Sequence, residues 1–172
     1  MDWREHQPRK KTCVLSKNRP KRQPATLYLQ LINPHNSYFK FMHIVITGGA
    51  GFVGSHLALA FKTKYPDYRI TCLDNLKRRG SELNLPRLKA SGIAFLHADI
   101  RNAEDLDAAG PFDCLIDASA EPSVLAGLNS SAVQLIDNNL FGTVNCLEAA
   151  KKNGAVFIFL STSRVYPIAP LE

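Results

Sequence analysis

Short apolar runs alternate with segments of helical periodicity between residues 42 and 160. Each run has the length of a strand and carries apolar side chains at successive positions instead of at every second one. A strand that is apolar throughout is buried on both faces, as in a parallel sheet covered by helices on each side. The runs that predict strands are His43–Thr47, Ile70–Leu73, Ile93–Leu96, Leu115–Ala118 and Ala155–Leu160.

Helical patterns separate the predicted strands. Ser55–Lys64 carries apolar residues at helical spacing, and Asn102 with acidic residues after it is typical of an N-cap and first helical turn. The longest pattern is Ser130–Lys152, and Gly154 suits the C′ position that ends it. Its apolar positions recur every three or four residues: Val133, Ile136, Leu140, Val144 and Leu147. The alternation predicts a doubly wound α/β domain with a parallel sheet in the strand order 3-2-1-4-5.

Length and composition limit the classes to which the chain can belong. Its 172 residues suffice for one domain, and 45% hydrophobic with 21% charged residues is ordinary for a globular chain. No apolar run approaches the roughly 18 residues of a membrane-spanning helix. The cysteines form no CxxC pair, and His43, His56 and His97 have no cysteine or carboxylate at metal-ligand spacing. We therefore expect no metal site, no disulfide framework, no membrane segment and a reducing, cytoplasmic setting.

The net charge of +6 is unevenly distributed. Residues 1–41 contain 9 lysines and arginines against 2 acidic residues, a net charge of +7. Residues 42–172 contain 12 against 13, a net charge of −1. The predicted domain is nearly neutral, so its charge gives no reason to expect nucleic-acid binding.

Residues 1–41 allow three interpretations. A basic arm for nucleic acid or an acidic partner would explain the charge. A targeting peptide is disfavoured, because the stretch has no apolar core segment and its prolines interrupt an amphipathic helix. We favour an appended, disordered leader, because Met42 stands directly before the first predicted strand, where a natural start would be expected.

A glycine-rich segment follows the first predicted strand and opens the first predicted helix. It reads TGGAGFVG at residues 47–54. Gly48 suits a tight turn, Gly51 leaves room for a pyrophosphate against the backbone, and Gly54 allows close helix–strand packing. The helix N-terminus would offer N–H groups and a positive dipole end to phosphates. Placed between a strand and a helix, the segment predicts a Rossmann-type dinucleotide-binding fold.

Asp74 ends the second predicted strand, 20 residues beyond Gly54. A carboxylate there accepts hydrogen bonds from the adenosine ribose of NAD. It repels the 2′-phosphate of NADP by about 1 to 4 kcal/mol at a separation of about 4 Å. We therefore predict NAD binding in preference to NADP, a preference that Arg78 and Arg79 could soften. The alternative is that Asp74 is only a turn residue before Asn75.

Residues 42–166 resemble the extended short-chain dehydrogenase/reductases, specifically the NAD-dependent epimerases and dehydratases that act on nucleotide sugars. The segments that carry the resemblance are TGGAGFVG at 47–54, DNL at 74–76, HADIR at 97–101, NNLFGT at 138–143 and STSRVY at 161–166. A longer match, DNLKRRG at 74–80 followed by Asn84 and Leu85, is similar to the CDP-tyvelose 2-epimerases, also called CDP-paratose 2-epimerases.

The resemblance implies roles for particular residues. Thr162 matches a catalytic hydroxyl that would hydrogen-bond the reacting sugar oxygen, and a threonine that only caps the strand end is the alternative. Glu121 and Ser123 could face the substrate or serve only as loop residues. The residues that match NAD contacts of the family are Gly48, Gly51, Phe52, Val53, Gly54, Asp74, Asn75, Asp99, Ile100, Ala118, Ala120 and Asn139.

Two departures from the family pattern bear on function. The segment DASA at 117–120 replaces the usual HLAA after the fourth strand, although the small residues beside the cofactor survive. The catalytic YxxxK does not occur, and Tyr166 is followed by PIAP. Without that pair the chain has no phenolate to take a proton from the sugar hydroxyl and no lysine to lower the pKa of the phenol.

We therefore interpret residues 42–172 as the N-terminal, NAD-binding part of a nucleotide-sugar epimerase or dehydratase. We expect it to be truncated after the fifth strand, to lack the C-terminal substrate domain and to be inactive alone. The complete enzyme would use NAD to oxidise its nucleotide sugar transiently. The alternative is a non-catalytic NAD-binding regulatory or scaffold module. The sequence is compatible with a homodimer, and it leaves the oligomeric state and the sugar open.

Overall fold

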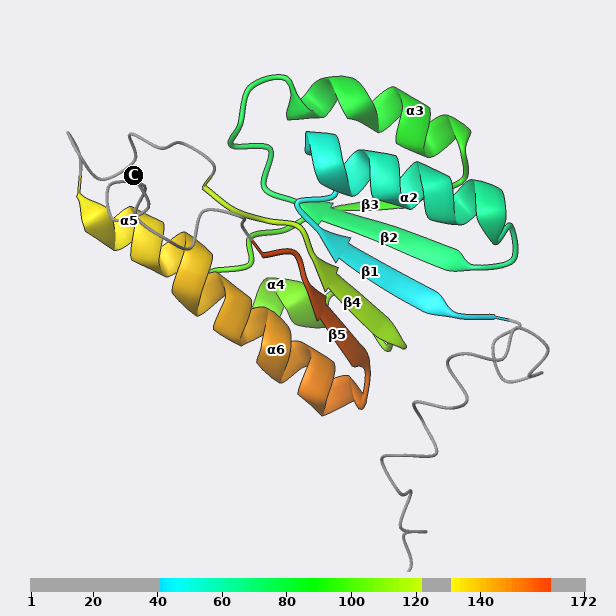
Figure 1. The fold of residues 1–172 in the computed structure, drawn as a ribbon. Helices are drawn as coiled ribbons and strands as arrows, with labels where there is room; N and C mark the ends of the chain where they lie inside the picture. The colour runs from blue at the N-terminus through cyan, green and yellow to red at the C-terminus, as the bar shows by residue number, and fades with distance from the viewer. Residues whose placement is uncertain (1–40, 122–130, 162–172) are drawn as a thin grey trace, which may run out of the picture. The chain divides into compact units, whose positions relative to one another are not determined.

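The predicted parallel sheet is confirmed. A computed structural model describes residues 41–121 and 131–161 of the chain, and in this part the strands lie in the order β3-β2-β1-β4-β5 with every neighbouring pair parallel (Figure 1). The strands are β1 (His43–Thr47), β2 (Arg69–Asp74), β3 (Ala94–His97), β4 (Cys114–Asp117) and β5 (Val156–Phe159). The bounds of β1 are the predicted ones, and those of the other four strands differ by one residue at each end, within the usual uncertainty of element ends.

Helices cover both faces of the sheet (Figure 1). On one face pack α2 (Phe52–Lys64) and α3 (Leu85–Ala90), and on the other pack α4 (Ala103–Asp107) and α6 (Gly142–Asn153). The short helical segment η2 (Ser81–Asn84) leads into α3, and neither element was predicted from the sequence.

Two apolar cores lie on opposite faces of the sheet and share its central strand. Val45 packs with Leu106 and Cys146 from α4 and α6, whereas Ile44 and Ile46 pack with the residues of α2 and α3. Successive side chains of a strand point to opposite faces, so a strand covered on both faces needs apolar residues at successive positions. This requirement is the physical reason for the apolar runs in the sequence.

The long C-terminal helix differs from its prediction in where it begins and in what it buries. It consists of α5 (Ala132–Ile136), a π-helical segment η3 (Asp137–Phe141) and α6, and it begins after Ser131, whose hydroxyl accepts the N–H of Val133. The predicted start at residue 130 was therefore too early. Gly154 ends the helix in the left-handed conformation, with φ +63°, as the C′ prediction required.

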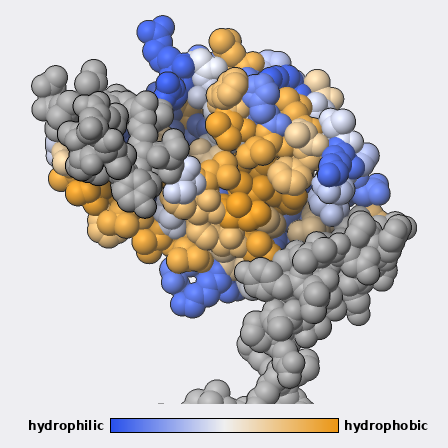
Figure 2. Space-filling view, in the orientation of Figure 1, coloured by the Kyte–Doolittle hydropathy of each residue, from blue (hydrophilic) through white to orange (hydrophobic). Residues whose placement is uncertain are grey.

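The apolar stripe of this helix faces away from the sheet. Small residues make the contact instead, because Gly142, Cys146, Ala149 and Ala150 are the buried ones. The members of the stripe are between 44% and 59% exposed: Val133, Ile136, Leu140, Val144 and Leu147. Figure 2 shows apolar side chains at the surface along this side of the molecule. Helical periodicity therefore predicted the helix, but only the structure shows which of its faces is buried.

None of the helices in the described part of the chain is long and apolar enough to cross a membrane. The predicted leader at residues 1–41 lies outside the described residues except for Phe41.

Candidate functional site

The turn after β1 requires glycine on steric grounds. Gly48 has φ +61°, and a Cβ atom there would lie 2.7 Å from the carbonyl oxygen of Ala118. A Cβ at Gly54 would collide with the carbonyl of Gly48, so the first turn of α2 packs directly on the turn after β1. Both contacts involve backbone atoms, which cannot rotate away as a side chain can. The backbone of the two segments can approach this closely only without side chains.

The N-terminus of α2 points its N–H groups out of this turn. Its N-cap residue Gly51 provides no side-chain hydrogen bond, and the first turn of the helix contains no acidic residue. The free N–H groups of a helix terminus and the positive end of its dipole favour an anion. The local sequence therefore leaves this terminus available to a ligand such as a phosphate.

The carboxylate of Asp74 is fixed beside the glycine turn. Its Oδ2 accepts the N–H of Ala50 at 3.1 Å, and its Oδ1 accepts the N–H of Leu76 at 2.8 Å. The hydrogen bond from Leu76 is the contact expected if Asp74 is only a turn residue, which was the alternative interpretation of this carboxylate. The side chain is nevertheless half-buried and lines a cavity, and each carboxylate oxygen has a second lone pair to offer. The turn role and a ligand role are therefore compatible.

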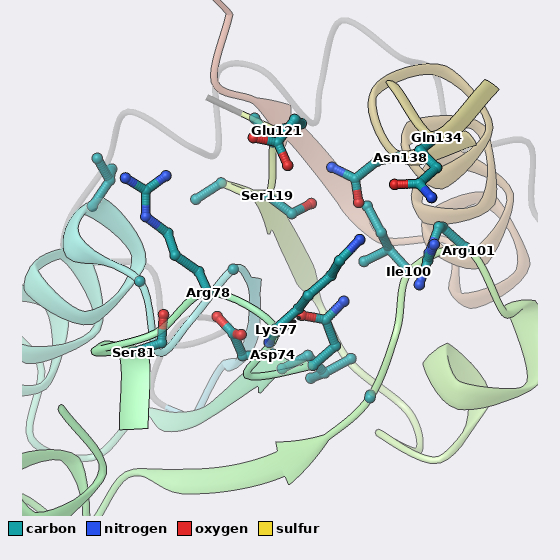
Figure 3. A pocket seen from close by; sticks show the side chains of 18 of the residues that line it. Asp74, Lys77, Arg78, Ser81, Ile100, Arg101, Ser119, Glu121, Gln134 and Asn138 are labelled. Carbon is teal, nitrogen blue, oxygen red and sulfur yellow. Dashed lines mark hydrogen bonds between the residues drawn. The ribbon is translucent and has the colours of Figure 1, made fainter. Parts of the chain in front are cut away.

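A cavity of about 650 Å³ opens where the carboxyl ends of the strands meet the helix α5–η3 (Figure 3). This edge of a parallel sheet is where doubly wound folds bind their ligands. Nine of the residues matched to NAD contacts line it: Gly48, Gly51, Phe52, Val53, Asp74, Asn75, Ile100, Ala118 and Ala120. Three others do not line it: Gly54, Asp99 and Asn139.

Asp99 forms an ion pair beside the cavity. Arg101 donates from Nε to Oδ1 at 2.9 Å and from a terminal nitrogen to Oδ2 at 2.6 Å, and Asn75 donates to Oδ2 at 3.0 Å. These hydrogen bonds, above all those from the Arg101 guanidinium, hold the pKa of the Asp99 carboxyl well below its usual range. Arg101 and Asn75 both line the cavity, so Asp99 holds two side chains of the cavity wall in place without lining the cavity itself.

Asn139 holds the segment that follows β4. Its Oδ1 accepts the N–H of Glu121 at 2.8 Å and the side-chain amide of Asn138 at 3.1 Å. Asn138, one position earlier on the π-helical segment, is the asparagine that lines the cavity together with Glu121. Neighbouring positions of a helix point in different directions, so the motif alone could not distinguish the two asparagines.

Asp117 is a buried carboxylate, and in the sequence it stood out only as a departure from the family pattern. It is 0% exposed, and it accepts hydrogen bonds from Thr47 at 2.7 Å, from Thr143 at 3.0 Å and from both the N–H and the hydroxyl of Ser119. Ser119 lines the cavity and Thr47 precedes the glycine turn. The signal available in the sequence was a charged residue at the end of an otherwise apolar strand, which must have partners if it is buried.

Thr162, Ser123 and Tyr166 lie outside the described residues. Within residues 41–121 and 131–161, no group of three or more His, Cys, Asp or Glu side chains is arranged to hold a metal ion.

Comparison with families of known proteins gives one match over most of the chain. Residues 44–171 match the model of the NAD dependent epimerase/dehydratase family.

Curated relatives and solved structures agree with this match. A trifunctional UDP-glucose 4,6-dehydratase/UDP-4-keto-6-deoxy-D-glucose 3,5-epimerase/UDP-4-keto-L-rhamnose-reductase of Arabidopsis thaliana is 34% identical over 134 residues, which are 74% of this chain and 20% of the relative. The CDP-paratose 2-epimerase of Salmonella typhi is 32% identical over 132 residues, which are 73% of this chain and 38% of the relative. The crystal structure of Helicobacter pylori ADP-L-glycero-D-manno-heptose-6-epimerase has a TM-score of 0.64 at 32% identity, over 74% of this chain and 41% of that one.

A further solved structure is a UDP-glucose-4-epimerase from Stenotrophomonas maltophila with bound NAD and formylated UDP-arabinopyranose. It has a TM-score of 0.63 at 25% identity, over 73% of this chain and 38% of that one. The chain thus spans between about one fifth and two fifths of the length of the relatives that it matches.

Proposed function

This chain belongs to the NAD-dependent epimerase/dehydratase family, and we propose that residues 42–172 form the NAD-binding part of a nucleotide-sugar epimerase or dehydratase. The observation that carries the proposal is the cavity at the carboxyl edge of the sheet, where the glycine turn and the Asp74 carboxylate come together. Relatives whose names are those of nucleotide-sugar enzymes support the substrate class.

The residues present fit NAD, because the wall of the cavity lacks side chains where a pyrophosphate would approach. Gly48 and Gly51 line the cavity beside the helix N-terminus, which would bind the pyrophosphate. Asp74 would accept hydrogen bonds from the adenosine ribose, and Ile100 would contact the adenine side. Ala118 and Ala120 would lie against the rest of the cofactor as small residues.

The chemistry of the complete enzyme would take place next to this cavity. Bound NAD supplies a reversible hydride acceptor for a sugar carbon. Thr162 follows β5 in the sequence, and we assign to its hydroxyl a hydrogen bond to the reacting sugar oxygen. Glu121 lines the cavity and would face the substrate side.

Titration calorimetry with NAD and NADP tests the cofactor assignment. We expect NAD to bind more tightly than NADP, because the Asp74 carboxylate accepts from the ribose hydroxyls and repels a 2′-phosphate. Asp74→Ala should weaken NAD binding roughly tenfold, since a hydrogen bond to a charged group contributes about 1.5–3 kcal/mol. Asp67→Ala is the matched control, because Asp67 is exposed in the turn before β2, at the opposite end of that strand. Equal affinities for the two cofactors, or no effect of Asp74→Ala, would contradict the assignment.

A non-catalytic NAD-binding regulatory or scaffold module is the second candidate. Such a module would hold NAD without converting a sugar, so it would need no proton acceptor such as the YxxxK pair. Both candidates require NAD binding. Only the enzyme also requires the tyrosine and lysine of YxxxK, which these 172 residues do not contain. Turnover restored by adding a separately expressed chain that contains YxxxK would favour the enzyme.

We also propose a homodimer that buries the apolar stripe of the long helix. The stripe residues are 44% to 59% exposed, and apolar patches of this kind mark interaction sites. Leu140→Glu and Val144→Glu should shift the sedimentation coefficient to that of a monomer, whereas Lys151→Glu at the end of the same helix should not. A wild-type chain that sediments as a monomer at all concentrations would exclude the dimer.

We place the protein in a reducing, cytoplasmic setting. Cys72, Cys114 and Cys146 are free and buried, and burial raises the pKa of the Cys72 thiol to about 12 and that of Cys114 to about 11. Such thiols behave as small core residues and not as disulfide partners. Fluorescence microscopy of the tagged chain in its own cells tests this placement.

A further inference from the structure

Asn84 stands directly before α3 and does not cap this helix. An asparagine at an N-cap normally accepts the N–H of the residue two or three positions later. Asn84 makes no such bond, and Pro86, two positions on, has no N–H to donate. Its side-chain amide donates instead to the carbonyl oxygen of Ala50 at 2.6 Å, across 34 positions of the chain. The side chain therefore contacts the glycine turn and not the helix that it precedes.

The backbone of Ala50 is held at both of its polar groups. Its N–H donates to Oδ2 of Asp74 at 3.1 Å, and its carbonyl accepts from Asn84. Ala50 is 0% exposed, and a buried carbonyl without a partner would destabilise the fold. The N–H of the same peptide group, on Gly51, donates to the carbonyl of Gly48 at 3.0 Å. The peptide plane between Ala50 and Gly51 is therefore fixed at both ends.

The segment that carries Asn84 is itself anchored. Leu88 of α3 is 0% exposed in the core on the α2 side of the sheet, and Arg87 donates to the hydroxyl of Ser55 in α2 at 2.6 Å. Two side chains from η2 and α3 thus contact the chain on either side of the N-terminus of α2. Because its own backbone is held in this way, Asn84 can fix the orientation of the peptide group that it contacts.

We propose that Asn84 is a positioning residue for the cofactor: through the Ala50 carbonyl it orients the peptide plane from which α2 begins, so that the N–H groups of Phe52 and Val53 face the pyrophosphate. This inference rests on the proposed function, because it takes the N-terminus of α2 as the pyrophosphate site. Phe52 and Val53 line the cavity, whereas Asn84 does not. Anion binding at a helix N-terminus depends on the direction of its N–H groups, so rotation of this plane weakens the ligand without the loss of a direct contact.

This role makes the effect of Asn84 specific to one part of the cofactor. ADP-ribose carries the pyrophosphate and uses the N-terminus of α2, whereas adenosine has no phosphate and uses only the ribose and adenine contacts. A residue that serves only the stability of the fold affects both ligands alike, or neither of them in a folded variant. The ratio of the two affinities is therefore the measure of positioning.

Asn153 supplies a matched control. Its side-chain amide donates to the backbone carbonyl of Ala149 on α6 at 2.9 Å, and neither residue lines the cavity. The bond is of the same type as that from Asn84 to Ala50. The loss of one such bond from the fold would follow Asn153→Leu as much as Asn84→Leu, and an effect on the pyrophosphate would not.

The experiment compares the binding of ADP-ribose and adenosine by calorimetry, using the full 172-residue chain, with urea denaturation of each variant to establish that it is folded. Asn84→Leu keeps the branched shape of the side chain and removes its amide. It should weaken ADP-ribose roughly tenfold, the equivalent of about 1.4 kcal/mol, and change adenosine by less than about twofold. Asn84→Ala, which adds no bulk beside the turn, should give the same ratio, and Asn153→Leu should change neither ligand by more than about twofold.

An equal loss of both ligands in the Asn84 variants would overturn the inference, because the residue would then support the cavity as a whole. Unchanged affinity for ADP-ribose in either folded Asn84 variant would also overturn it, because the turn would keep its shape without the amide. Failure of the wild type to bind ADP-ribose would contradict the proposed function itself, whereas binding by the wild type and both variants alike would contradict only the positioning role.

Discussion

The hydroxyl of Thr47 donates a 2.7 Å hydrogen bond to Oδ1 of Asp117, and the two residues are paired in register at the carboxyl ends of β1 and β4. Thr47 leads directly into Gly48, and Asp117 leads into Ala118, whose carbonyl leaves no room for a side chain at Gly48. The other carboxylate oxygen accepts from Thr143 on α6. One buried side chain thus connects the glycine turn, the segment after β4 and the long helix.

Asp117→Ala should destabilise the fold strongly. It would leave the hydroxyls of Thr47 and Thr143 and the groups of Ser119 without their acceptor. Each buried donor left unsatisfied costs about 1–3 kcal/mol, so we expect a loss of at least about 3 kcal/mol in the free energy of unfolding. Urea denaturation measures this change.

Asp117→Asn is the informative companion variant. The amide keeps one oxygen for Thr47 and Ser119, and Thr143 can accept from the new NH₂ group, so the loss should be less than half of that for alanine. Asp107→Ala, which removes an exposed ion pair with Lys152, should cost no more than about 1 kcal/mol. Equal losses for the alanine and asparagine variants would mean that Asp117 matters through its charge and not through the hydrogen bonds.

His43 should make the stability depend on pH near neutrality. Its ring is buried at the start of β1, where Nδ1 lies 2.7 Å from the carbonyl of Pro111 and Nε2 lies 2.9 Å from Thr71 Oγ1. Burial lowers the pKa of His43, the bond to Pro111 opposes this, and the charges of Arg69 and Asp113 act in opposite directions. The folded state therefore favours the neutral ring, with Nδ1–H donating to the carbonyl.

A base whose pKa is lower in the folded state than in the unfolded state stabilises the fold fully above the unfolded pKa, which is about 6.5 for histidine. This stability is lost as the pH falls below that value. We expect the free energy of unfolding to be smaller at about pH 5.5 than at about pH 7.5, and His43→Asn to reduce this difference. His56→Asn, at an exposed position on α2, is the control. The same pH slope in wild type and His43→Asn would show that His43 does not carry the effect.

The sheet could be predicted from the sequence because the evidence for each strand lies within a few consecutive residues. Apolar runs such as Ile44–Ile46 have to be buried on both faces, and that condition leads directly to a parallel sheet between helices. The carboxyl ends of parallel strands meet at one edge, so Gly48 and Asp74 could be placed together without any structure.

The parts of the site that escaped prediction depend on contacts between distant residues. Asp117 and Thr47 are 70 positions apart, and Asp117 and Thr143 are 26 apart, so no sequence window contains the set. Similarly, motif matching assigned Asp99 and Asn139 to the cofactor, while the structure directs their side chains to Arg101 and to the N–H of Glu121. A motif gives the position along an element, and packing decides which way a side chain points.

The chain should show no sustained turnover of nucleotide sugars. It contains no YxxxK, and positioned general acid–base groups contribute about 10²- to 10⁴-fold to the rate. UDP-glucose and CDP-paratose incubated with the chain and NAD should be recovered unchanged when analysed by chromatography, with a complete UDP-glucose 4-epimerase as the positive control. Sustained conversion that Thr162→Val abolishes would mean that another residue of these 172 supplies the base.

The central claim, that the glycine turn binds the pyrophosphate of NAD, is tested most directly by titrating NAD into Gly51→Ala. Gly51 has φ −69°, which alanine adopts freely, and a Cβ there would meet only the carbonyl oxygen of Gly48, at 3.1 Å. The added methyl would face the cavity, so NAD should bind at least roughly tenfold more weakly, the equivalent of about 1.4 kcal/mol, with little change in stability. Gly110→Ala, at φ +69° and away from the cavity, should show the opposite pattern of lower stability and unchanged NAD affinity. Unchanged affinity in folded Gly51→Ala would contradict the claim.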